Sequence, residues 1–140
     1  MRQMKKFTLA AALAALPFAA AAQDASLGQI EYVNSCAQCH GTGGAGDGII
    51  AGFLSVQAPD LTQLQKNNDG VFPFARVYGV IDGSTPVGIH GTVDMPAWGQ
   101  RYAAKASAML GWEYGRADQE AFVRGRILAL VEYIATIQDM

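Results

Sequence analysis

Apolar residues recur every three to four positions in several stretches of this chain, which is the pattern of an amphipathic α-helix. The pattern predicts a first helix over about 25–37 and a last helix over about 118–137. Shorter helical stretches are predicted at 61–65, 72–81 and 102–109. The last helix has the most continuous apolar face, which consists of Phe122, Ile127, Leu130, Val131, Ile134 and Ile137. The sequence therefore predicts an all-α fold.

The predicted first and last helices each contain an interior glycine. Gly28 lies within the first helix, whose apolar spacing comes from Leu27, Ile30, Tyr32 and Val33. A glycine inside a helix costs about 1 kcal/mol relative to alanine, and it often marks the close approach of another element. Gly125 occupies a similar position in the last helix. We therefore expect the two helices to cross at close quarters, although a loose first turn would also accommodate Gly28.

A glycine-rich segment separates the first helix from the middle of the chain. Its six glycines are Gly41, Gly43, Gly44, Gly46, Gly48 and Gly52. The segment superficially resembles a phosphate-binding loop, but no strand is predicted before it and no Lys-Ser/Thr pair follows it. A flexible loop is the better interpretation.

Composition separates the first 22 residues from the rest of the chain. Arg2, Lys5 and Lys6 form a basic start, an apolar run of about 15 residues follows, and Ala20–Ala22 supply small residues for cleavage. A membrane anchor is the alternative, but the run is shorter than the roughly 20 residues that span a bilayer. We therefore expect residues 1–22 to be a cleaved secretory signal and the protein to be periplasmic. The remainder contains no second apolar span.

Removing the signal changes the charge of the protein. The whole chain has ten basic and twelve acidic residues, and the signal contains three of the basic ones and none of the acidic ones. Residues 23–140 therefore carry a net charge of −5, and their 118 residues fit one domain. An acidic protein of this kind is a poor candidate for nucleic-acid binding, and it favours partners with a basic or neutral docking face.

The only two cysteines lie in the segment Cys36-Ala37-Gln38-Cys39-His40. The pattern C-x-x-C-H is typical of c-type haem attachment, because each thiol can bond one haem vinyl group while the adjacent imidazole reaches the iron. A thioredoxin-like pair would need a βαβ pattern, and a zinc site about four ligands. The chain has only two histidines, His40 and His90. A structural disulfide in an exported protein is the remaining alternative.

An attached haem with one histidine ligand leaves the opposite face of its iron open. Met95 precedes Pro96, which favours extended backbone and therefore a loop that presents its side chain. A methionine in that position is the ligand that raises the potential of electron-transfer haems. The rival ligands are His90, Met109 and Met140. Met95 is the leading prediction, with His90 or an open site as alternatives.

Four motifs in this order resemble those of class I (mitochondrial-type) cytochromes c, in particular small exported ones of proteobacteria. They are Gly28-x-x-x-Tyr32 before the C-x-x-C-H segment with Gly41, Ala58-Pro59-Asp60-Leu61, Asp94-Met95-Pro96-Ala97-Trp98-Gly99, and Leu130-x-x-Tyr133. The resemblance covers nearly all of residues 23–140. It implies a cytochrome c fold in which the N- and C-terminal helices cross around a covalently attached haem, with Gly28 and Tyr32 facing Leu130 and Tyr133.

The resemblance also implies the roles of individual residues. Cys36 and Cys39 would hold one haem c, and His40 and Met95 would be the axial ligands of its iron. The carbonyl group of Pro59 would accept the N–H of His40 and fix the ring. Two departures concern docking: the segments 82–93 and 101–117 are long for the smallest members of the family, and the family's basic docking face is absent.

The expected function is one-electron transport rather than enzymatic catalysis, since two filled axial positions leave no site for a substrate. Partners would be a dehydrogenase or quinol-oxidising complex and a terminal oxidase or reductase. Phe53, Arg76 and Trp98 are candidates to line the haem pocket, and Arg76 or Trp98 could bond a propionate. The alternatives are a dedicated subunit of one periplasmic dehydrogenase, and a haem enzyme or ligand sensor with an open sixth position.

Overall fold

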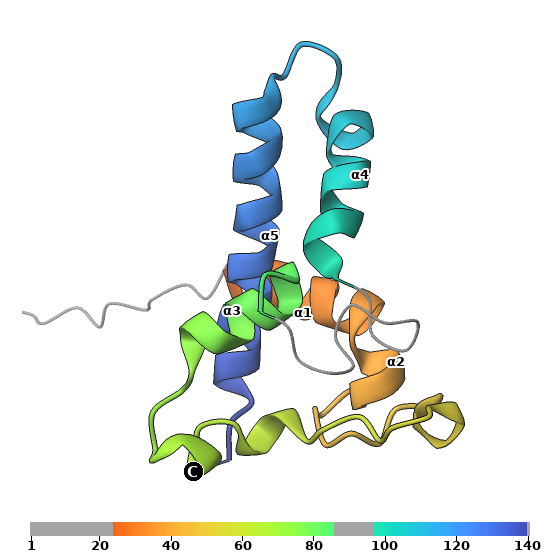
Figure 1. Cartoon of the computed structure of the whole chain (residues 1–140), viewed down its shortest axis with the longest axis vertical. Helices are drawn as coiled ribbons and strands as arrows, with labels where there is room; N and C mark the ends of the chain where they lie inside the picture. Colours follow the sequence, from red (N-terminus) through yellow and green to blue (C-terminus); the bar gives the residue numbers. More distant parts are fainter. Residues whose placement is uncertain (1–23, 86–96, 140) are drawn as a thin grey trace, which may run out of the picture.

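The computed structural model describes residues 24–85 and 97–139, and within these ranges it is mostly helical and contains no β-strand (Figure 1). The α-helices are α1 (Asp24–Ser35), α2 (Ala37–His40), α3 (Phe74–Asp82), α4 (Trp98–Leu110) and α5 (Arg116–Thr136). Three single 3₁₀ turns connect α2 to α3, namely η1 (Ala51–Phe53), η2 (Leu61–Gln63) and η3 (Lys66–Asn68). The predicted all-α class is therefore confirmed for the described residues.

Most predicted helices are present, but their bounds differ. The predicted first helix, about 25–37, corresponds to α1, and the single turn α2 that follows it carries the second cysteine and the histidine of the motif. Helix α4 begins four residues earlier than predicted and includes Gly99, which packs so closely on α3 that a Cβ atom there would lie 2.6 Å from the carbonyl oxygen of Asp82. Helix α5 begins after Gly115, whose N–H donates to Oδ2 of Asp118 at 3.0 Å.

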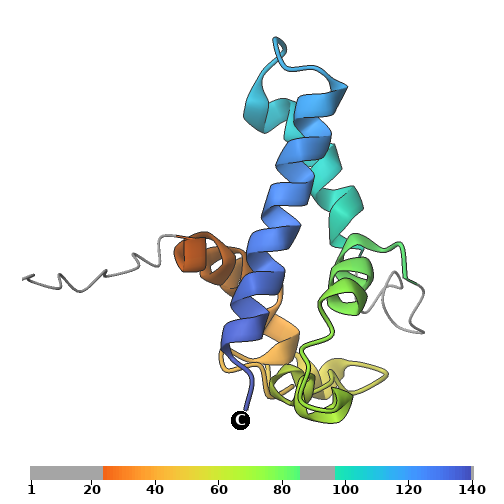
Figure 2. The ribbon, with the colours of Figure 1, turned by 90° about the vertical axis from the view of Figure 1, so that its left-hand side faces the viewer.

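Helix α1 crosses α5 (Figure 2), and Gly28 lies at the crossing. A Cβ atom at this glycine would lie 2.1 Å from the carbonyl oxygen of Ala129 and 2.8 Å from Cβ of Tyr133. The rings of Tyr32 and Tyr133 pack beside this point, with their centroids 5.1 Å apart. The predicted close crossing is therefore confirmed at Gly28. The parallel prediction for Gly125 is wrong, because that glycine is exposed and a Cβ atom there would meet nothing within 4 Å.

The buried face of α1 is not the one that its apolar spacing indicates. Leu27, Ile30 and Val33 are between 40% and 55% exposed. The face that packs into the protein instead carries Tyr32, which is fully buried, and Glu31, which is 6% exposed. A carboxylate can occupy this face because it is paired there with a cation and a hydroxyl group, which are described below.

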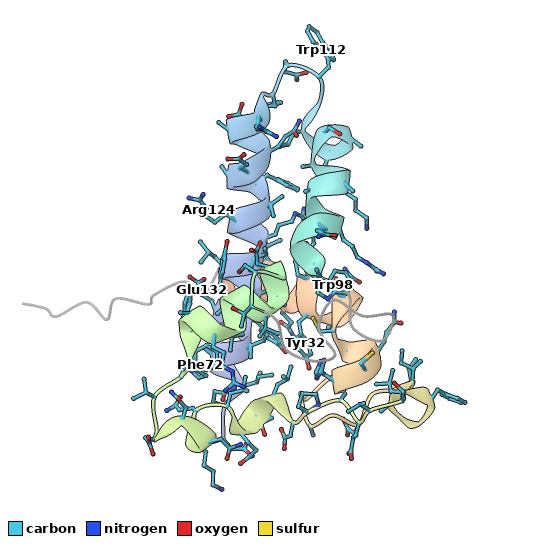
Figure 3. The ribbon with its side chains drawn as sticks, viewed as in Figure 1. Tyr32, Phe72, Trp98, Trp112, Arg124 and Glu132 are labelled. Atoms are coloured by element: carbon cyan, nitrogen blue, oxygen red, sulfur yellow. The ribbon has the colours of Figure 1, made fainter. Side chains whose placement is uncertain are left out.

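The core lies where α1, α3, α4 and α5 meet. Its members are Tyr32, Cys36, Val77, Ile81, Trp98, Tyr102, Ile127, Leu130, Val131 and Ile134. Four of the six residues predicted for the apolar face of α5 are among them, and the other two are half-buried. The far ends of α4 and α5 project away from this core, and the exposed Trp112 marks the turn between them (Figure 3).

Within the described ranges, the structure has no helix that combines the length and the apolar character needed to cross a membrane. The residues of the predicted signal, 1–22, lie outside these ranges.

Candidate cofactor site

The C-x-x-C-H segment forms a single helical turn that follows directly from α1. The N–H of Cys36 donates to the carbonyl oxygen of Tyr32 at 2.8 Å, and the N–H of His40 donates to that of Cys36 at 2.9 Å. Cys39 and His40 therefore lie three and four residues beyond Cys36, on one face of the turn. This local geometry brings two thiols and an imidazole together without any contribution from distant parts of the chain.

Two contacts fix this turn to the rest of the protein. The hydroxyl group of Tyr32 donates to the carbonyl oxygen of Gly41 at 2.7 Å, which anchors the end of the turn to α1. On the other side, the glycine-rich segment packs directly on the turn, because the N–H of Gly48 donates to the carbonyl oxygen of Cys39 at 3.1 Å. A Cβ atom at Gly48 would lie 2.2 Å from the carbonyl oxygen of Gln38, so only glycine permits this approach.

The imidazole of His40 is 3% exposed and held in one orientation. Its Nδ1 lies 3.1 Å from the carbonyl oxygen of Pro59, which can only accept, so the proton is on Nδ1 and the lone pair is on Nε2. This is the hydrogen bond that the family resemblance implies. Burial lowers the pKa of His40, and the hydrogen bond to Pro59 opposes that effect only in part. The ring is therefore kept in its neutral form, which is the form that binds metals.

The two cysteines differ in their surroundings. Neither forms a disulfide bond; Cys36 is buried in the core, and Cys39 is half-buried. Burial raises the pKa of Cys36 to about 12, and the neighbouring Cys39 adds to that effect. Cys36 is therefore a neutral thiol in this environment, unlike the low-pKa thiolates of redox-active pairs.

Trp98 begins α4 close to this turn and belongs to the same core as Cys36 (Figure 3). Its indole Nε1 is buried and has no hydrogen-bond partner in the structure. A buried donor that lacks an acceptor costs about 1–3 kcal/mol, so such an atom in a native protein calls for an explanation. An acceptor supplied by a bound group would satisfy it. The guanidinium group of Arg101 packs 5.0 Å from the centre of the Trp98 ring.

The other residues predicted to line the haem pocket are exposed. Phe53 is 89% exposed, on a 3₁₀ turn that contacts α2, and its place beside a haem stays a prediction. Arg76 lies on the exposed face of α3, in contact with solvent rather than with the core. Met109, a rival ligand, is 55% exposed on α4. The predicted ligand Met95 and its rival His90 lie outside the described residues, as does Met140.

Sequence reasoning missed a second cluster of polar side chains beside the motif. Glu31 of α1 accepts hydrogen bonds from Arg126 of α5 and from the hydroxyl group of Tyr102 of α4, the latter at 2.8 Å. Burial raises the pKa of this hydroxyl group, and the nearby Ser35 side chain opposes that effect. The only signal in the sequence was Glu31 itself, directly before Tyr32. The helical pattern places this acidic residue in solvent.

A separate cleft of about 680 Å³ lies between α3, α4 and α5. Its lining includes the polar side chains of Tyr78, Asp82, Arg116 and Arg124. None of the predicted cofactor residues that the structure describes lines it. Among residues 24–85 and 97–139, no group of three or more His, Cys, Asp or Glu side chains is arranged to hold a metal ion.

We compared the chain with models of known protein families, with curated proteins and with solved structures, and none of the three comparisons gave a match.

Proposed function

We propose that this protein is an exported cytochrome of the class I type, which carries one electron at a time on a single covalent haem c. Cys36 and Cys39 would hold the haem through thioether bonds, and His40 and Met95 would be its axial ligands. The observation that carries the proposal is the geometry of the C-x-x-C-H turn, in which the imidazole is buried, neutral and fixed by Pro59.

Several features of the described residues fit such a group. The two thiols lie one turn apart, which suits attachment to two vinyl groups on one edge of a porphyrin. The orientation of His40 leaves Nε2 as the ligating atom, with a backbone carbonyl group behind the ring as is usual for metal-bound histidines. The partnerless Nε1 of Trp98 would find an acceptor in a haem propionate.

In this proposal the polypeptide orients the cofactor and controls its access to water. A bound haem c supplies an iron that cycles between two oxidation states. His40 holds its position throughout, because the Pro59 carbonyl group and the surrounding core prevent rotation of the ring. The extensive burial of Cys36 and Trp98 excludes water from one side of the site. A rigid site of this kind requires little rearrangement when an electron arrives or leaves.

Covalent attachment is tested by mass and colour. The protein is produced in a bacterium that exports and matures c-type cytochromes, and it is purified from the periplasm. We expect a red protein whose mass exceeds that of residues 23–140 by one haem, and a Cys36→Ser/Cys39→Ser variant that lacks covalent haem. A colourless parent with the mass of the bare processed chain would reject the proposal.

The second axial ligand is tested by spectroscopy of two matched variants. We expect the Met95→Ala variant to lose the methionine-to-iron charge-transfer band and the His90→Ala variant to keep it. The reverse pattern would reject Met95 as the ligand. Rapid, tight binding of carbon monoxide to the reduced parent protein would instead support an enzyme or sensor with an open sixth position.

The charge of the exported chain bears on its partners. Residues 23–140 carry a net charge of −5, so a redox partner with a basic or neutral docking face is favoured. Electron exchange with a basic partner would become slower as ionic strength rises, because salt screens the attraction. Stopped-flow reduction by periplasmic extracts at two salt concentrations measures this effect. Co-purification of a dehydrogenase in fixed stoichiometry would indicate a dedicated subunit rather than a free carrier.

A further inference from the structure

We propose that the cluster of Glu31, Arg126 and Tyr102 sets the reduction potential of the cofactor, an inference that rests on the function proposed above. Glu31 and Arg126 act as a fixed pair of opposite charges beside the attachment turn. Tyr102 is the positioning residue that holds the carboxylate of Glu31 in place. None of the three is a ligand or an attachment residue.

The geometry of the cluster is unusually constrained for a group of polar side chains. Glu31 and Arg126 are 95 residues apart in sequence, and their side chains are 8% and 21% exposed. The two carboxylate oxygens have different partners: Oε1 accepts from the guanidinium group of Arg126, and Oε2 accepts from the hydroxyl group of Tyr102 at 2.8 Å. The guanidinium group also packs 4.6 Å from the centre of the Phe122 ring. Neither charge can therefore move far from its place.

The cluster and the attachment turn share one core, because Tyr102 and Cys36 are both buried members of it. Tyr102 also forms the hydrogen bond to Glu31 that ties the carboxylate to this core. The Tyr102 ring lies one helical turn after Trp98, with the ring centroids 6.1 Å apart. Both rings belong to the core that includes Cys36. Burial raises the pKa of Tyr102, so its hydroxyl group stays protonated and continues to donate to Glu31.

Charges in such a place act strongly on a redox centre. The oxidised haem carries one more positive charge than the reduced haem, and buried charges are poorly screened by water and salt. The carboxylate of Glu31 favours the oxidised state and lowers the potential, whereas the guanidinium group of Arg126 has the opposite effect. If the substitutions acted only by loosening the packing, both would expose the site to water. The potential would then shift in the same direction whichever partner was removed.

The experiment is a measurement of midpoint potentials by spectroelectrochemistry at pH 8 on the haem-loaded protein. We expect Glu31→Gln to raise the potential and Arg126→Gln to lower it. The matched controls are Glu132→Gln and Arg124→Gln, which make the same charge changes at exposed positions of α5. We expect the controls to shift the potential less than the corresponding buried variants. Circular dichroism verifies that each variant is folded.

Shifts no larger than those of the controls, or shifts of both buried variants in one direction, would overturn the inference. If Glu31→Gln or Arg126→Gln does not fold, Tyr102→Phe decides the question, because it keeps both charges and the aromatic ring. Loss of the hydroxyl donor leaves the carboxylate less neutralised, so the potential should fall, and an unchanged potential would overturn the inference. A haem-bearing protein with unshifted potentials rejects this inference alone, whereas a parent protein without haem rejects the proposed function as well.

Discussion

The crossing of α1 and α5 makes a sharp prediction about two glycines that look equivalent in the sequence. In Gly28→Ala, the new Cβ atom would lie 2.1 Å from the carbonyl oxygen of Ala129 and 2.8 Å from Cβ of Tyr133. Neither atom is the end of a flexible side chain, so neither can rotate away. The helices would have to separate by about 1 Å to restore an ordinary contact distance, which disturbs packing along the whole crossing.

The magnitude follows from two opposing effects. Overpacking of a well-packed core costs about 1–3 kcal/mol, and a rigid obstacle places this case near the upper end. Alanine gains about 1 kcal/mol over glycine as a helix former. We therefore expect Gly28→Ala to lower the free energy of unfolding by about 2 kcal/mol. For a domain of this size the midpoint of thermal unfolding should fall by roughly 8 °C.

Gly125→Ala is the matched control, since this position lies in a helix but a Cβ atom there would contact nothing within 4 Å. The same substitution should raise the free energy of unfolding by about 1 kcal/mol. Urea unfolding followed by far-ultraviolet circular dichroism measures both variants. The reasoning is refuted if Gly28→Ala unfolds at the same urea concentration as the parent protein, or at a higher one.

Three further substitutions test the support of the attachment turn. Tyr32→Phe removes the hydrogen bond to the Gly41 carbonyl group, and urea unfolding should show a loss of about 1–2 kcal/mol. Asp60→Ala removes the carboxylate that accepts a hydrogen bond from the N–H of Thr62 at the start of η2, and the same assay should show a loss of about 1 kcal/mol. Gly48→Ala places a Cβ atom against the turn, so mass spectrometry should find a smaller haem-bearing fraction, whereas Gly43→Ala, with open space around it, should leave this fraction unchanged.

The elements that sequence reasoning located well are those specified by local pattern. The apolar face of α5 was predicted almost residue by residue, because a long amphipathic helix repeats its signal over several turns. The proximity of Cys36, Cys39 and His40 also follows from spacing alone, since one helical turn suffices to bring them together. The hydrogen bond from His40 to Pro59 is different. It joins residues 19 apart, and only the family resemblance pointed to it.

Sequence reasoning went wrong where one residue type can occupy two different structural environments. Glycine inside a helix marks a close crossing at Gly28 but only an exposed, weakly helical position at Gly125. The assignment of Phe53 and Arg76 to a haem pocket stays a prediction, since both side chains are exposed in the structure. Whether such a residue meets another element depends on the rotation of each helix about its axis, which no local pattern specifies.

The orientation of α1 shows how a polar cluster can override the hydrophobic pattern. Burial of Leu27, Ile30 and Val33 would have left Glu31 in water, and it would have gained about 1.5–3 kcal/mol for each buried apolar side chain. The observed orientation of α1 instead places Gly28, the only glycine of this helix, against α5. It also places Tyr32 in the core. Glu31 is then buried as a consequence, and Arg126 and Tyr102 neutralise the cost of its burial. The close approach of α1 to α5 at Gly28 and the buried ion pair between Glu31 and Arg126 are therefore two results of one helix orientation, and a change at either should affect the attachment turn that follows α1.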